Sequence, residues 1–188
     1  MAETHLDERT ERYAREVAAA IDSVAAVREA FALGSAAVGG FDPATSDLDL
    51  VVVVSEPLGE SRHELLGKLR QLAAPVRDLE LVVYVDGAQP PDFELNVNEG
   101  EEQLDAEPFW FVLDAALAQK LAVPLLHRRA WSEFFEPVSP ARTREAMQAS
   151  LDWTGRQPDE NAFAKAHAAR ARHYLEHGEW ISKKEAQP

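Results

Sequence analysis

The feature that most constrains this chain is a run of four valines, Val51–Val54, directly preceded by Asp47-Leu48-Asp49-Leu50. Such a β-branched run is typical of a strand buried on both faces of a sheet. Because strand side chains alternate, we expect Asp47 and Asp49 on one face and the two leucines on the other. Neighbouring carboxylates repel, and magnesium, which prefers oxygen ligands, relieves that repulsion. The pattern predicts a metal site at the start of a buried strand, although two solvated acids would give the same letters.

A glycine-serine pair, Gly34 and Ser35, lies upstream, where a short strand at Phe31–Leu33 is expected to end. The small residues that follow favour a helix that begins at this pair. Free N–H groups at a helix start bind anions, glycine lets a phosphate approach closely, and a serine hydroxyl adds a donor. Ser46, just before the first aspartate, either contacts phosphate or caps the loop. Gly-Ser alone is more often a capped turn than a phosphate site.

A third carboxylate, Glu80, lies within the apolar segment 78–85 (DLELVVYV), which predicts a second strand. A carboxylate inside an apolar strand is unfavourable unless it is paired or binds a metal. On a half-exposed strand, the same residue would simply face solvent. The segment alone leaves both interpretations open.

Composition narrows the class of protein. The 188 residues contain no cysteine, which excludes disulfides, cysteine zinc sites and thiol nucleophiles. The formal net charge of −14 repels nucleic acid and attracts cations, so we expect a cationic small molecule rather than a nucleic acid as partner. The charged start is unlike a signal peptide, and no apolar run is long enough to cross a membrane, so a cytoplasmic protein is expected.

The remaining pattern predicts a small sheet with helices, followed by helices alone. Apolar residues at helical spacing predict one long amphipathic helix from Leu6 to Ala30. The period changes near residue 100, which predicts a domain boundary between 1–104 and 105–188. The other expected elements are helices at 62–74, 109–123, 142–153 and 162–177, an edge strand at 92–98, an acidic loop at 99–107 and a loop with core aromatics at 126–138.

Together these motifs resemble the nucleotidyltransferase superfamily, and specifically the bacterial aminoglycoside (3'')(9)-adenylyltransferases and their relatives. The resemblance covers essentially the whole chain and is carried by LGSAAVGGFDPATSDLDLVVVV, LELVVY, FELNV, EPFWFVLDAAL, FFEPVSPARTREAMQASLDW and GEWISKKEA. It implies an α/β (α+β) nucleotidyltransferase fold with a small mixed sheet. An all-α C-terminal domain would follow, shortened here because family chains run on for some tens of residues beyond the last motif.

The resemblance also implies roles for the site residues. Asp47 and Asp49 would hold magnesium, with Glu80 completing the metal site and acting as the catalytic base. Gly34 and Ser35 would cradle the phosphates of ATP. A positioned carboxylate suits this chemistry because an alcohol is a weak nucleophile at neutral pH.

Outside the sheet, the resemblance implies further contacts. Ser46 and Lys183 would contact phosphate, and Asp159 and Glu160 would line the aminoglycoside side of the cleft. From the residues alone, Lys183 could be an exposed tail lysine and the two acids could cap a helix. The loop after Trp153 lacks a further tryptophan found in the resistance enzymes, so streptomycin recognition does not follow.

The implied activity is magnesium-dependent transfer of AMP from ATP to a hydroxyl of an aminoglycoside-like cationic small molecule, with release of pyrophosphate. Two alternatives stay open. One is a nucleotide-binding or regulatory protein of the same fold without turnover. The other is a toxin-type nucleotidyltransferase that acts on a protein or an RNA, which the acidic surface and the aminoglycoside-like second half disfavour.

Overall fold

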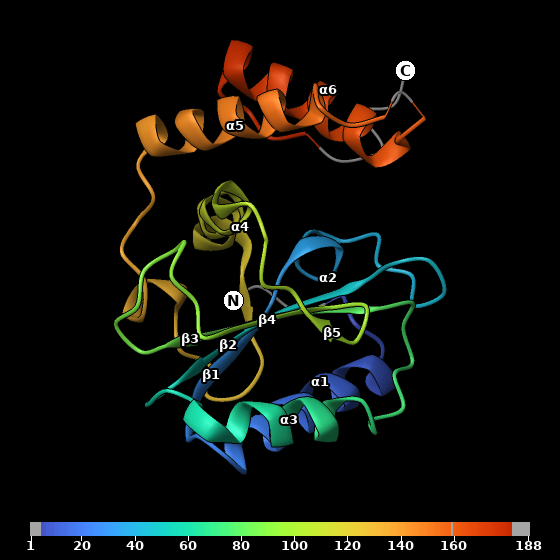
Figure 1. Cartoon of the computed structure of the whole chain (residues 1–188), viewed down its shortest axis with the longest axis vertical. Helices are drawn as coiled ribbons and strands as arrows, with labels where there is room; N and C mark the ends of the chain where they lie inside the picture. The colour runs from blue at the N-terminus through green and yellow to red at the C-terminus, as the bar shows by residue number, and fades with distance from the viewer. Residues whose placement is uncertain (1–4, 159, 182–188) are drawn as a thin grey trace. The chain divides into compact units, whose positions relative to one another are not determined.

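A computed structural model describes residues 5–158 and 160–181 (Figure 1). It contains two compact units. The sheet unit comprises the chain up to residue 106 together with residues 117–137, and the helical unit comprises residues 107–116 and the chain from residue 138 onwards. None of the helices in the described ranges has the length and apolar character that a membrane crossing requires.

The sheet unit is built on one six-stranded mixed sheet, which confirms the predicted fold class. Its strand order is β5-β4-β3-β2-β1-β6. The β2–β3 pair is parallel, and the other neighbours are antiparallel. The strands are β1 (Val27–Ala32), β2 (Leu48–Val54), β3 (Leu79–Val85), β4 (Leu95–Asn98), β5 (Glu101–Glu102) and β6 (Val123–Pro124).

One face of the sheet packs on two helices, α1 (Glu8–Asp22) and α3 (Arg62–Leu69), which lie side by side in Figure 1. Leu48 and Leu50 point into this core and are 0% and 1% exposed. Alternation along β2 therefore turns the residue between them, Asp49, to the opposite face. The predicted separation of aspartates from leucines holds for this part of the strand.

The opposite face is covered in part by aromatic side chains from the segment after β6. The ring of Trp131, in the 3-10 turn η2 (Trp131–Glu133), lies 5.2 Å from that of Phe31 in an edge-on contact. The ring of Phe135 contacts Tyr84 of β3 in the same way, also at 5.2 Å. These aromatics are buried, as the sequence predicted for core residues.

The predicted helix from Leu6 to Ala30 is wrong in its second half. Helix α1 ends at Asp22, and Val27–Ala32 forms β1, paired with β2 on one side and β6 on the other. The carboxylate of Asp22 accepts the N–H of Val27 at 2.8 Å across the turn. Apolar spacing suited a longer helix, but pairing with the valine run decides the conformation of this segment.

Two smaller predictions also need correction. β4 is not an edge strand, because β5, within the predicted acidic loop, pairs with its outer side. Helix α3 ends at Leu69 rather than near residue 74, with Arg70 as its C-cap. The Arg70 side chain binds the carbonyl of Gly100 and the carboxylate of Glu101.

Three helices account for most of the helical unit, in agreement with the prediction of an all-α second half. The first turns of α4 (Pro108–Leu121) belong to it, together with α5 (Pro140–Thr154) and α6 (Ala162–His177). Ser139 and Asn161 cap the starts of α5 and α6 through their side chains. Gly178, in the left-handed conformation, ends α6.

The units divide the chain differently from the predicted boundary after residue 104. The first crossing lies close to it, between residues 106 and 107. Residues 117–137 then return to the sheet unit, because β6 hydrogen-bonds to β1 and the aromatics after it cover the sheet. A two-residue strand next to a helix leaves no detectable pattern in the sequence.

Candidate nucleotidyl-transfer site

Two carboxylates lie side by side on the face of the sheet opposite α1 and α3. Asp49 of β2 and Glu80 of β3 are direct partners in the parallel register. Partners in a parallel pair point to the same face, so both side chains leave the sheet together. Asp49 is half-buried and Glu80 is exposed. The structure thus brings together two of the three acids that the sequence predicted for the site.

Gly34 packs directly against the carboxylate of Asp49. It begins the short helix α2 (Gly34–Val38) with a φ of +53°, as predicted for the glycine-serine pair. A Cβ at this position would lie 1.9 Å from Oδ2 of Asp49. The preceding residue, Leu33, donates its N–H to the carbonyl of Asp49 at 2.9 Å, which holds the two segments together. Only glycine fits both the backbone conformation and the space.

Asp47, directly before β2, has a different partner. The guanidinium of Arg77 donates two hydrogen bonds to the Asp47 carboxylate, from Nε to Oδ1 at 2.7 Å and from Nη2 to Oδ2. The Asp47 side chain is only 13% exposed, whereas that of Arg77 is 60% exposed. The hydrogen bond and charge of Asp47 raise the pKa of Arg77, and the charges of Asp78 and Glu80 act in the same direction. Arg77 therefore lies within the field of three carboxylates, Asp47, Asp78 and Glu80.

The two predicted serines lie on either side of the loop between α2 and β2. Ser35 is in the first turn of α2, where its carbonyl accepts the N–H of Gly39 at 3.0 Å. The hydroxyl of Ser46 accepts the N–H of Asp42 at 3.1 Å, so it closes the loop as one of the two predicted alternatives stated. Its contact with phosphate stays a prediction.

The residues present can be compared with what a divalent cation requires. Asp47, Asp49 and Glu80 offer only carboxylate oxygens, the donor type that magnesium prefers. Across residues 5–158 and 160–181, no three His, Asp or Glu side chains converge as a metal-binding group. One of the three acids, Asp47, forms an ion pair with Arg77. The donor set fits magnesium, and a cation bound to Asp47 would have to displace the Arg77 guanidinium.

The other predicted site residues belong to the second half of the chain. Lys183 and Asp159 lie outside the described residues. Glu160 is exposed in the turn before α6, next to the helix-capping Asn161. Its role in binding an acceptor stays a prediction.

The helical unit also contains a buried histidine that the sequence did not single out. His167 of α6 is 7% exposed, and its ring lies 4.6 Å from that of Trp110 and 6.1 Å from that of Phe163. Its buried Nε2 has no hydrogen-bond partner among the described residues. Burial lowers the pKa of His167 to about 4, so the ring is neutral at pH 7.

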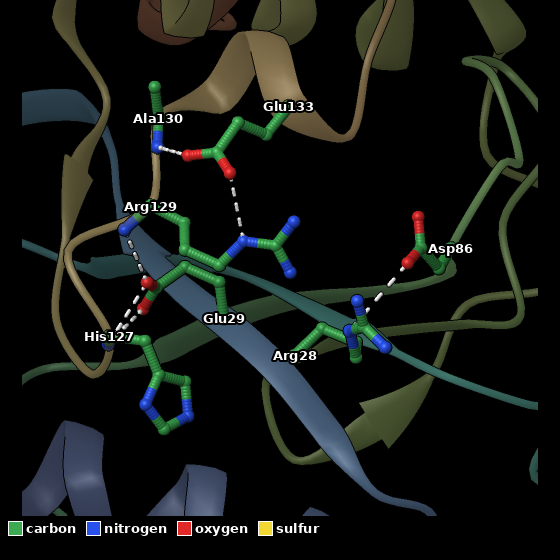
Figure 2. Close-up of polar contacts among 7 residues, drawn as sticks. All are labelled: Arg28, Glu29, Asp86, His127, Arg129, Ala130 and Glu133. Atoms are coloured by element: carbon green, nitrogen blue, oxygen red, sulfur yellow. Dashed lines mark hydrogen bonds and ion pairs between the residues drawn. The ribbon is translucent and has the colours of Figure 1, made fainter.

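Sequence reasoning missed two charged residues of the sheet unit. Arg77 could have been found, because a basic residue three positions before Glu80 must lie near Asp47 once β2 and β3 are paired in parallel. Glu29 could not, since its segment has a helical pattern. The Glu29 carboxylate is 0% exposed and accepts backbone N–H groups from Leu126, His127 and Arg129 at 2.8 to 3.2 Å. The contacts with His127 and Arg129 are drawn in Figure 2. It fastens the loop after β6 to β1.

Comparisons with known proteins agree with this fold. No curated protein sequence matches the chain. Among solved structures, it is similar to spectinomycin adenyltransferase AAD(9) from Enterococcus faecialis, crystallised with ATP and spectinomycin. The TM-score is 0.78 with 19% sequence identity, over 96% of this chain and 81% of that chain. At this identity the likeness shows the fold, and it extends through the helical unit.

The family model of the nucleotidyltransferase domain matches residues 13–107. This range holds α2, β2 and β3, and with them Gly34, Asp47, Asp49, Arg77 and Glu80. The chain therefore belongs to the nucleotidyltransferase family.

Proposed function

We propose that this protein transfers AMP from ATP to a hydroxyl group of a cationic, aminoglycoside-like small molecule, with magnesium and with release of pyrophosphate. The observation that carries the proposal is the pairing of Asp49 with Glu80 on parallel strands, with Gly34 pressed against the Asp49 carboxylate. Such an arrangement concentrates oxygen ligands beside a backbone that phosphate can approach closely.

The residues would divide the chemistry between them. Asp49, Asp47 and Glu80 would hold magnesium, which when bound neutralises charge on the triphosphate and on the leaving pyrophosphate. Gly34 and Ser35 would donate backbone N–H groups to phosphate oxygens, and Lys183 would add a positive charge there, with Ser46 beside them.

Glu80 would act as the base. Its carboxylate would accept the proton of the acceptor hydroxyl while that oxygen forms a bond to the α-phosphorus. The bond from the α-phosphorus to the bridging oxygen breaks, and pyrophosphate leaves in line with the attack. The exposure of Glu80 leaves room for an acceptor to reach it.

Charge supports a cationic acceptor. The net charge of −14 raises the concentration of cations near the protein, and Asp159 and Glu160 would provide local carboxylates for amino groups. The structurally similar spectinomycin adenyltransferase, crystallised with ATP and spectinomycin, supports both a small-molecule acceptor and ATP as donor.

The test is pyrophosphate release by the full chain with magnesium and each of the four nucleoside triphosphates, across a panel of aminoglycosides, spectinomycin and neutral sugars. We expect release with ATP and one or more cationic acceptors, together with a mass increase of the acceptor by one adenylyl group. Binding of ATP without release for any acceptor would favour a nucleotide-binding protein without turnover. Transfer of the nucleotidyl group to an added protein or RNA instead of a small molecule would favour the toxin-type activity.

A further inference from the structure

Arg77 occupies the position that decides whether Asp47 is available to a cation. Both oxygens of the Asp47 carboxylate accept hydrogen bonds from its guanidinium. The planar, two-pronged contact is the strongest geometry that an arginine makes with a carboxylate. With the Asp47 side chain only 13% exposed, little of it remains open to a second partner.

Arg77 is the more exposed member of the pair. Its side chain is 60% exposed and extends from the turn before β3, so leaving Asp47 requires no rearrangement of the sheet. The Asp47 side chain, in contrast, is only 13% exposed and has less freedom to move. The side chain that can leave the ion pair is therefore that of Arg77.

We propose that Arg77 is a built-in counter-cation of the nucleotide site, which neutralises Asp47 until a divalent cation displaces it. A dication repels a guanidinium on the same carboxylate, so the two compete. The Asp78 carboxylate lies near enough to attract the released side chain. This inference rests on the proposed function, because it assumes that Asp47 binds the metal.

Competition of this kind weakens the binding of the metal alone. An ion pair with one well-exposed partner contributes little free energy, so its removal should raise the affinity for a divalent cation by about three- to tenfold. A residue that only stabilised the fold would change the melting temperature without raising the affinity for a metal.

The test uses Mn²⁺ as the probe, titrated into the full chain without nucleotide and followed by the electron paramagnetic resonance of the free ion. We expect Arg77→Gln to bind Mn²⁺ about three- to tenfold more tightly than the wild type, with Arg77→Lys between them. Arg70→Gln is the matched control, because Arg70 forms an exposed ion pair with Glu101 on another part of the sheet unit. It should bind Mn²⁺ like the wild type.

Equal or weaker binding by Arg77→Gln would overturn the inference and leave the proposed function standing. If Asp49→Asn did not weaken Mn²⁺ binding, either in the wild type or in the Arg77 variants, both the inference and the proposed function would be overturned. Adding Asp47→Asn supplies a second arm that does not depend on the stability of any one variant. In that background Arg77→Gln should gain little affinity, and a full gain would show that Arg77 acts elsewhere.

Discussion

Two groups of carboxylates in the sheet unit differ in what surrounds them. Glu29 is 0% exposed, and its oxygens accept the N–H groups of four residues, Ala30, Leu126, His127 and Arg129. Figure 2 shows the contacts with His127 and Arg129. Asp49 and Glu80, in contrast, are partly open to solvent and lie beside each other. Backbone donors cannot leave, so Glu29 is a structural anchor. Acids that lie together at an accessible face are suited to bind something that comes and goes.

The second group is also held differently. Asp47, two residues before Asp49, is paired with Arg77, a flexible and largely exposed side chain. Carboxylates close together store repulsion that a ligand of positive charge can release. Burial among fixed backbone donors is what we expect of an acid that serves the fold, whereas partial exposure beside an exposed side-chain partner is what we expect of an acid that serves chemistry.

The largest effect should follow from Glu80→Gln. Loss of the base should lower the rate of nucleotidyl transfer by about 10²- to 10⁴-fold, because glutamine cannot accept the proton of the acceptor. Binding of ATP and the melting temperature should stay close to wild type. Measurement of kcat by pyrophosphate release checks this, with the exposed Glu60→Gln as control; unchanged kcat in the Glu80 variant would remove it from the role of base.

Gly34→Ala should damage both the site and the fold. The new Cβ would meet Asp49 Oδ2, and the φ of +53° disfavours alanine, at about 1 to 3 kcal/mol of stability. Gly59 has the same φ, but a Cβ there would meet no atom within 4 Å, so Gly59→Ala isolates the backbone effect. Only the Gly34 variant should lose affinity for ATP, about tenfold or more by calorimetry. Equal losses of ATP affinity in both variants would show that the close contact between Gly34 and Asp49 is not what the nucleotide site requires.

Glu29→Gln should have the opposite effect to Glu80→Gln, with a loss of stability and no loss of activity. An amide NH₂ would face backbone donors in a buried position, which should lower the free energy of unfolding by about 1 to 3 kcal/mol. Transfer activity of the folded protein should remain. Denaturant unfolding checks this against Glu133→Gln, since Glu133 caps the same loop from an exposed position (Figure 2). A catalytic defect in Glu29→Gln with normal stability would break the distinction between the two groups.

His167 in the helical unit is also buried, but its Nε2 has no hydrogen-bond partner among the described residues. An unfolded histidine binds its proton near pH 6.5 and the folded one only near 4, so the unfolded state holds more protons between these values. The lowered pKa of His167 therefore affects stability in a defined range: above about pH 6.5 the neutral ring costs the fold nothing, and stability is lost as the pH falls from there to about 4. His167→Phe should therefore flatten the fall of the melting temperature over that range, whereas His177→Gln, at an exposed position, should not. Parallel curves for wild type and His167→Phe would contradict this.

The sequence predicted the elements whose pattern is strong and local. The valine run placed β2, the DLELVVYV segment placed β3, and α6 was predicted with the bounds that the structure shows. The D-x-D motif and Glu80 stand out because a carboxylate in or beside an apolar strand is costly without a partner. In each case the signal lay within a dozen residues.

What the sequence could not predict depends on pairing between distant segments. The apolar spacing of β1 suits either a helix or a strand, and only its pairing with β2 decides. The partners of Glu29 come from a loop about a hundred residues further on. The parallel pairing of β2 and β3 places Arg77 near Asp47, but the two-pronged contact between them depends on side-chain orientation, which the sequence does not encode.

The most direct test of the account is calorimetric binding of a non-hydrolysable ATP analogue with magnesium to the wild type and to Asp49→Asn. Asp92→Asn, at an exposed position before β4, is the matched control. We expect the wild type and Asp92→Asn to bind alike and Asp49→Asn to lose at least tenfold in affinity, with all three melting at similar temperatures without ligand. Equal affinity in Asp49→Asn would contradict the claim that the acids on β2 and β3 form the nucleotide site.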